Sequence, residues 1–268
     1  MSATMSNATD TAMSAATNTA TNTAAGSAGD QVEWSTHARF AVYYAPSSES
    51  SWWRAGSAWL GRDAQSGERC VSPQPEGLTR PLADLTEAPR RYGWHGTLVA
   101  PFCLAEGVTQ QDVLEATRRW AHTQSAFALP VEATTLGDFV ALRPADQDGD
   151  ATIGAVAASA LRSLDALRAR PSATDLARRL AAPLSDRQRT LLIEWGYPYV
   201  FDEFRFHMTL SSSLTQADER ATLVAWWQAQ TPALGPLAID HAALFVEPAP
   251  GEPFVLWQRV PFQTREVK

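Results

Sequence analysis

Two short stretches decide the fold: residues 91–102 read RYGWHGTLVAPF, and residues 204–213 read FRFHMTLSSS. In both, a histidine is followed two positions later by a threonine. Aromatic, β-branched and leucine residues surround each motif, which predicts strands over 94–99 and 204–210. Because residues i and i+2 of a strand project from the same face, each histidine shares a face with its threonine.

The segments that follow the two motifs repeat in the same order. A predicted helix comes first in each copy, and then a hairpin that finishes with FVALRP at 139–144 or with FVLWQRVP at 254–261. From histidine to final hairpin strand is 44 residues in the first copy (95 to 139) and 47 in the second (207 to 254). We therefore predict an α+β class, with a bilobal duplicated fold in which two antiparallel β-sheets surround a central cleft and helices pack outside.

The composition changes near Trp34. Residues 1–33 are dominated by Ala, Ser, Thr and Asn, and they lack the basic region and apolar core of a secretory signal. Such a segment buries too little apolar surface to offset its ordering entropy, so we expect a disordered low-complexity tail. The remainder predicts a single bilobal domain over 34–268, with lobe one at about 34–150, a helical linker at about 151–200 and lobe two at about 201–268.

Composition and charge narrow the class of partner. The 268 residues are 45% hydrophobic and carry a formal charge of −7, which disfavours a surface that tracks long nucleic acid. No run of about 18 apolar residues occurs, so no membrane partner is expected. Two cysteines are too few for a disulfide scaffold and fit a reducing compartment. We expect a cytoplasmic monomer whose partner is a small anionic phosphodiester substrate.

The paired motifs suggest a chemistry. If the two lobes pack about a two-fold axis, both histidine–threonine faces meet across one cleft. His95 and His207 then suit metal-independent phosphodiester hydrolysis, because one neutral imidazole accepts a proton from water and one protonated imidazole donates to the leaving oxygen. The hydroxyls of Thr97 and Thr209 would hold the non-bridging oxygens, where negative charge builds. We predict no metal and no cofactor.

Three further residues are candidates for substrate binding. Arg205 lies two positions before His207, and Ser211 extends the same predicted face. Arg205 is a candidate phosphate ligand or, alternatively, a surface ion-pair partner of a neighbouring carboxylate. Tyr43 closes a predicted strand over 40–44, where its hydroxyl either faces a ligand or packs in the core.

The paired motifs resemble the signature of the two-histidine (2H) phosphoesterase superfamily. The words ARFAVYYAP, SAWLGRD, RRYGWHGTLVAPF and FDEFRFHMTLS are similar to its branch found in phosphonate-utilisation (carbon–phosphorus lyase) operons, and the resemblance covers about 38–261. It implies a bilobal α+β fold, catalytic histidines with phosphate-holding threonines, no metal, and a cyclic phosphate on a ribose or nucleotide. The chain departs from this pattern at Val99, where relatives often have lysine, and at 211–213, where Ser-Ser-Ser replaces Thr-Gly-Arg. Both departures remove a cation, which puts the substrate choice in question.

We therefore expect a hydrolase, a metal-independent cyclic phosphodiesterase acting on a small ribose or nucleotide cyclic phosphate in phosphonate metabolism. The alternative is a non-catalytic protein that binds phosphate esters or RNA ends in the same cleft. A metallohydrolase is disfavoured because each motif supplies a single histidine, without the spacing of a metal site.

Overall fold

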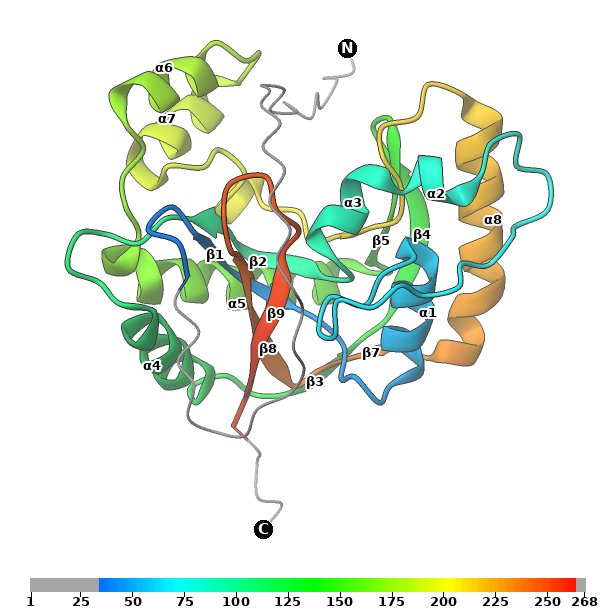
Figure 1. Ribbon diagram of the computed structural model, residues 1–268, viewed down its shortest axis with the longest axis horizontal. Helices are drawn as coiled ribbons and strands as arrows, with labels where there is room; N and C mark the ends of the chain where they lie inside the picture. Colours follow the sequence, from blue (N-terminus) through cyan, green and yellow to red (C-terminus); the bar gives the residue numbers. More distant parts are fainter. Residues whose placement is uncertain (1–33, 264–268) are drawn as a thin grey trace.

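The computed structural model describes residues 34–263, and the predicted tail over 1–33 lies outside the described residues. The described chain forms a seven-stranded antiparallel sheet in the order β4-β5-β6-β2-β1-β8-β9 and a two-stranded antiparallel sheet, β3-β7 (Figure 1). The strands are β1 (Arg39–Tyr44), β2 (Gly96–Phe102), β3 (Phe127–Leu129), β4 (Val131–Leu136), β5 (Phe139–Pro144), β6 (Met208–Thr209), β7 (Leu237–Ile239), β8 (His241–Glu247) and β9 (Val255–Pro261). This arrangement confirms the predicted α+β class with two antiparallel sheets.

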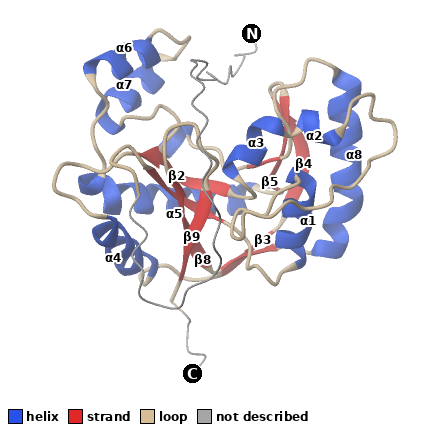
Figure 2. Ribbon diagram, in the orientation of Figure 1, coloured by secondary structure: helices blue, strands red, loops and turns tan. Residues whose placement is uncertain are grey.

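Helices lie outside the sheets (Figure 2). They are α1 (Ser51–Leu60), α2 (Leu82–Leu85), α3 (Glu87–Tyr92), α4 (Gln110–Ala121), α5 (Gln147–Leu164), α6 (Ala173–Leu180), α7 (Asp186–Trp195) and α8 (Ala217–Leu234). Helix α8 packs on β4 and β5, whereas α4 packs on β8 and β9 and α5 packs on β2. Helices α6 and α7 stand away from the sheets, at the upper left of Figure 1.

The two copies of the sequence repeat form two similar structural units, and each unit's hairpin lies on the other unit's side of the sheet. The first copy runs β2, α4, β3 and the hairpin β4–β5, and the second runs β6, α8, β7 and the hairpin β8–β9. Hairpin β4–β5 pairs with β6, the strand of the second copy, whereas hairpin β8–β9 lies on the far side of β1 from β2. Each hairpin therefore lies on the side of the sheet that holds the other copy's histidine strand.

A local two-fold axis relates the copies. Gly96 lies directly opposite Met208 in the antiparallel pair of β2 and β6, and each follows its motif histidine by one position. Ala128 of β3 lies opposite Ala238 of β7 in the second sheet, again at matching positions of the repeat. An antiparallel pair has a two-fold axis between directly opposed residues. The two motifs are thus equivalent by symmetry and adjacent in space.

Strand β6 is much shorter than the strand predicted over 204–210, which was wrong in extent. Residues 201–203 form a 3₁₀ turn in which Phe201 has a positive φ of 54°. The backbone enters the sheet only at Met208, where it meets Gly96. This turn, with its one left-handed residue, sets the direction of the chain, and residues 204–207 reach the sheet only at its end.

Close packing beneath the motifs holds β2 and β6 in place. The indole nitrogen of Trp59 on α1 donates to the backbone oxygen of Leu210, just after β6, at 2.7 Å. A Cβ added to Gly96 would lie 2.4 Å from the ring of Phe206, so this aromatic ring packs directly against the β2 backbone. Glycine in the first motif is therefore a packing requirement.

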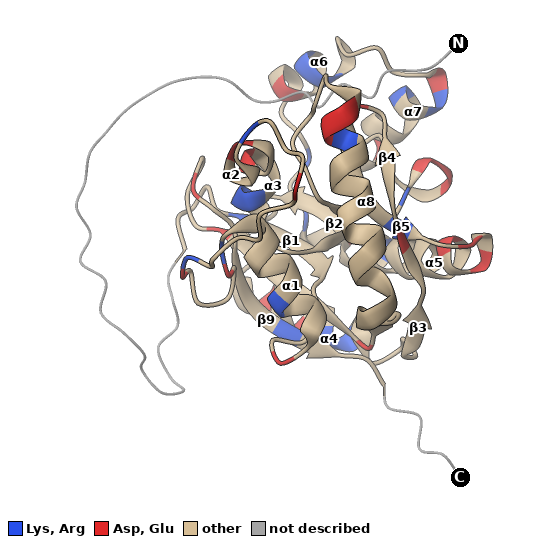
Figure 3. Ribbon diagram, turned by 90° about the vertical axis from the view of Figure 1, so that its right-hand side faces the viewer, with Lys and Arg blue, Asp and Glu red and all other residues tan. Residues whose placement is uncertain are grey.

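The long connection between α1 and α2 is fastened to α8. Its Arg80 donates to both carboxylate oxygens of Glu219, at 2.9 and 2.6 Å, and Thr79 donates to the same carboxylate at 2.9 Å. Glu219 is buried in the first turn of α8, which holds the charged residues of that helix (Figure 3). Because the buried carboxylate is paired and hydrogen-bonded, the connection is fixed at this end.

Candidate active site

The four motif side chains share one face of the sheet. In the register that places Gly96 opposite Met208, His95 lies opposite Thr209 and Thr97 lies opposite His207. Side chains alternate along a strand and match across a pair, so all four project on the side away from Phe206. The structure thus brings together the four residues for which catalytic roles were predicted.

The two imidazoles are anchored in the same way. Nδ1 of His95 lies 2.8 Å from the backbone oxygen of Gly93, and Nδ1 of His207 lies 2.8 Å from that of Arg205. A carbonyl oxygen only accepts hydrogen bonds, so Nδ1 carries the proton in each ring. In the neutral rings Nε2 is consequently the nitrogen with a free lone pair.

Both imidazoles favour the neutral form. Burial lowers the pKa of His95 to about 4, against the hydrogen bond to Gly93, and the positive charge of a protonated His207 lowers it further. Burial also lowers the pKa of His207, and the guanidinium of Arg143 adds to that effect. The effect of a protonated His207 on His95 is consistent with two rings that face the same side of the sheet.

Aromatic residues wall the first histidine. Tyr43 lies opposite Thr97 in the β1–β2 pair, and its ring stacks on His95 with a centroid separation of 3.9 Å. The rings of Tyr92 and Phe245 each lie 6.1 Å from the His95 ring. Tyr43 is 1% exposed, and burial raises the pKa of its phenol, so the phenol stays neutral and its ring packs on His95 in the core. Its contact with substrate stays a prediction.

The other two substrate-binding candidates are engaged elsewhere. Arg205 is exposed, and its guanidinium donates to the backbone oxygens of Asp202 and Phe204, at 2.8 and 2.6 Å. Ser211 is buried: its hydroxyl accepts from the backbone nitrogen of Val140 at 2.9 Å and donates to a neighbouring backbone oxygen at 2.8 Å. The structure brings neither side chain to the four motif residues, and their phosphate-binding roles stay predictions.

Arg143 lies beside the site, and it was not among the candidate residues predicted from the sequence. The β5–β6 ladder pairs Ala141 with Thr209 and ends at Leu142 and Met208, so Arg143 and His207 are the next residues beyond its end, and the guanidinium lies near enough to lower the pKa of His207. The signal in the sequence was its place in the repeated FVALRP word, but only the pairing of β5 with β6 puts it beside a histidine.

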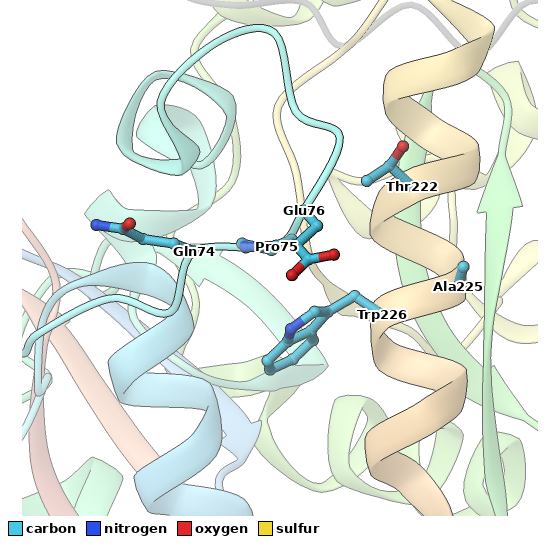
Figure 4. A pocket seen from close by; sticks show the side chains of 6 residues that line it. All are labelled: Gln74, Pro75, Glu76, Thr222, Ala225 and Trp226. Atoms are coloured by element: carbon cyan, nitrogen blue, oxygen red, sulfur yellow. The ribbon is translucent and has the colours of Figure 1, made fainter.

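One cavity lies beside the motif residues, and a second lies away from them. A small one, about 20 Å³, lies beside Thr97 and is lined by Tyr197 and Tyr199 among others. A larger one, about 470 Å³, lies between the α1–α2 connection and α8, where Glu76 and Trp226 face each other (Figure 4). None of the motif residues lines the larger cavity.

Within residues 34–263, no three or more His, Cys, Asp and Glu side chains gather as a metal site would require. Over the same range, no helix combines the length and apolar character that crossing a membrane takes.

The chain belongs to a known family. Residues 97–255 match the family described as "Protein of unknown function (DUF1045)", and this span covers more than half of the chain. The match begins at Thr97 of the first motif, takes in the hairpin β4–β5 and the second motif, and ends at Val255, the first residue of β9.

Two curated relatives are similar over most of the chain. One, from Janthinobacterium sp. (strain Marseille), is named "Ribose 1,5-bisphosphate phosphokinase PhnN" and is 39% identical over 253 residues, which is 88% of this chain and 55% of the relative. Another with the same name, from Laribacter hongkongensis (strain HLHK9), is 41% identical over 226 residues, 83% of this chain and 51% of the relative. The chain spans about half the length of these relatives.

A solved structure titled "Crystal structure of phosphoesterase" aligns with 84% of this chain and 98% of its own, at a TM-score of 0.35 and 13% identity. A similarity this weak carries no argument about function.

Proposed function

We propose that the protein is a metal-independent phosphodiesterase that opens a small cyclic phosphate ester of ribose or a nucleotide. The observation that carries the proposal is the arrangement of His95, Thr97, His207 and Thr209 on one face about a local two-fold axis. Two imidazoles with matching anchors and free Nε2 atoms are what a reaction with one proton acceptor and one proton donor requires.

In the proposed step one histidine accepts a proton and the other donates one. A neutral imidazole takes a proton from water through Nε2 while the water oxygen forms a bond to phosphorus. The protonated second imidazole donates its Nε2 proton to the ring oxygen as the phosphorus–oxygen bond breaks. The products are a phosphomonoester and a free hydroxyl, and Thr97 and Thr209 donate hydrogen bonds to the non-bridging oxygens during the step.

The relatives' name supports the substrate class. Ribose 1,5-bisphosphate is a phosphate ester of ribose, which is the chemistry proposed for this site. The resemblance to the branch found in phosphonate-utilisation operons supports a place in phosphonate metabolism.

The phosphokinase activity in the relatives' name belongs, we infer, to the half that this chain does not match. Kinases and P-loop phosphotransferases hold the transferred phosphates with a lysine. The sequence contains one lysine, Lys268, which follows a valine and therefore is not part of a Gly-Lys-Ser/Thr loop.

The test is a hydrolysis assay over 2′,3′-cyclic nucleotides and 1,2-cyclic ribose phosphates, with and without EDTA. The informative variants are His95→Asn and His207→Asn, because asparagine keeps a donor in the place of Nδ1 and removes Nε2. Each should lower kcat by about 10²–10⁴-fold. His122→Ala is the control, since His122 is exposed at the end of α4.

Turnover at the wild-type rate in either asparagine variant would refute the proposed roles. Binding of cyclic phosphates without turnover across the panel would favour the alternative, a phosphate-ester binding protein.

A further inference from the structure

Arg143 stands out from the other half-buried arginines of the protein. Arg39, Arg91 and Arg168 form ion pairs, and Arg62 and Arg259 donate to backbone oxygens. The Nε atom of Arg143 is buried without a partner, as are those of Arg168 and Arg259. Unlike theirs, the terminal nitrogens of Arg143 form no hydrogen bond or ion pair among residues 34–263, so they are free to donate to an anionic ligand.

The surroundings of Arg143 offer no strong internal acceptor. Glu132 lies opposite it in the β4–β5 pair, but Glu132 is exposed and forms no ion pair with Arg143 in the described part of the chain. On its other side Arg143 faces His207, and the two are close enough for the guanidinium to influence the imidazole. The free donors of Arg143 therefore lie at the edge of the motif face.

Arg205, the other arginine considered for this face, donates to backbone oxygens of its own segment. Arg143 comes from a different strand, β5, and the pairing of β5 with β6 brings it to the motif face.

We propose that Arg143 binds the phosphate group of the substrate, donating hydrogen bonds to its non-bridging oxygens beside His207 and Thr209. This assignment rests on the proposed function for the substrate class, but the phosphate site itself does not require turnover. Guanidinium matches the geometry of a phosphate through two parallel hydrogen bonds, which lysine or a threonine cannot do.

The experiment measures binding of inorganic phosphate by calorimetry, alongside NMR titration of the His207 imidazole, in the full chain. Arg143→Gln should weaken phosphate binding about 10–100-fold, the loss expected for charged hydrogen bonds. It should also raise the pKa of His207, because a neighbouring positive charge is removed. Arg143→Lys keeps the charge, so it should retain the low His207 pKa while recovering only part of the phosphate affinity.

Arg118→Gln is the matched control, since it removes an exposed arginine of α4, away from the motif face, and it should change neither measurement. Glu132→Gln should leave phosphate binding equal or tighter. Phosphate binding that is unaffected by Arg143→Gln, or absent from the wild-type protein at 20 mM phosphate, would overturn the assignment. Arg143-dependent phosphate binding in a protein that hydrolyses no diester would refute the proposed function and leave the phosphate site standing.

Discussion

The pH dependence of kcat/KM follows from the surroundings of the two imidazoles. Hydrolysis needs one neutral and one protonated ring, and that state is most populated between the two apparent pKa values, which belong to the pair. Burial lowers the pKa of His95 to about 4 and lowers the pKa of His207 as well. Both values thus lie below the ordinary histidine value of about 6.5, and the optimum of kcat/KM should lie between about pH 4 and 6.5.

The size of the effect is given by the fall of kcat/KM on the basic side of the pH optimum. Above the upper pKa the reactive state falls tenfold per pH unit, so kcat/KM at pH 8.5 should be at least about 100-fold below its maximum. The assay is the initial rate at low substrate concentration in a buffer of constant ionic strength. A phosphodiester keeps one negative charge over this range, so the profile reports the enzyme.

Stability has to be followed in parallel. Because the folded state favours the neutral imidazoles, the unfolded chain binds more protons between about pH 6.5 and 4, and the free energy of unfolding falls as the pH falls through that window. A thermal melt at each pH separates this loss from the acid limb. An optimum at or above pH 7.5, or a flat profile to pH 8.5, would contradict the lowered pKa values of the two imidazoles.

Three further changes test the fold around the site. Gly96→Ala places a methyl group against the ring of Phe206, and overpacking of this kind should lower the free energy of unfolding by about 1–3 kcal/mol. We therefore expect a lower Tm and a loss of activity, and an unchanged Tm would show that the ring moves aside. Glu247→Ala removes a fully buried carboxylate that receives two arginines, and should cost about 3–5 kcal/mol in denaturant unfolding. Ser211→Ala leaves the backbone nitrogen of Val140 without its acceptor and should lower stability by about 1–3 kcal/mol. Its KM should stay that of the wild type, and a raised KM would instead support the predicted contact with substrate.

The motif strands were predictable because their information is local. Alternation along a strand places His95 with Thr97 and His207 with Thr209, whatever the rest of the chain does. The length of the second strand was not predictable in this way, since the turn at 201–203 keeps residues 204–207, which follow it, out of the ladder despite their alternating apolar pattern.

The partners of the histidines depend on long-range pairing. The position of Arg143 beside His207 requires that β5 pairs with β6 in one particular register, and residues 64 positions apart carry no local sign of it. Arg205 shows the converse: a pattern of alternating residues suggests a shared face, yet its guanidinium binds backbone oxygens of its own segment.

The axis between Gly96 and Met208 has a consequence for ancestry. Two identical chains that meet in an isologous contact produce such an axis, with residue i of one on residue i of the other. A half-length polypeptide with a single H-x-T motif would therefore build the same pair of imidazoles only as a homodimer. Joining two such genes in tandem frees each half to diverge, and the tyrosine beside one histidine and the arginine beside the other are differences that an identical pair of subunits could not have held.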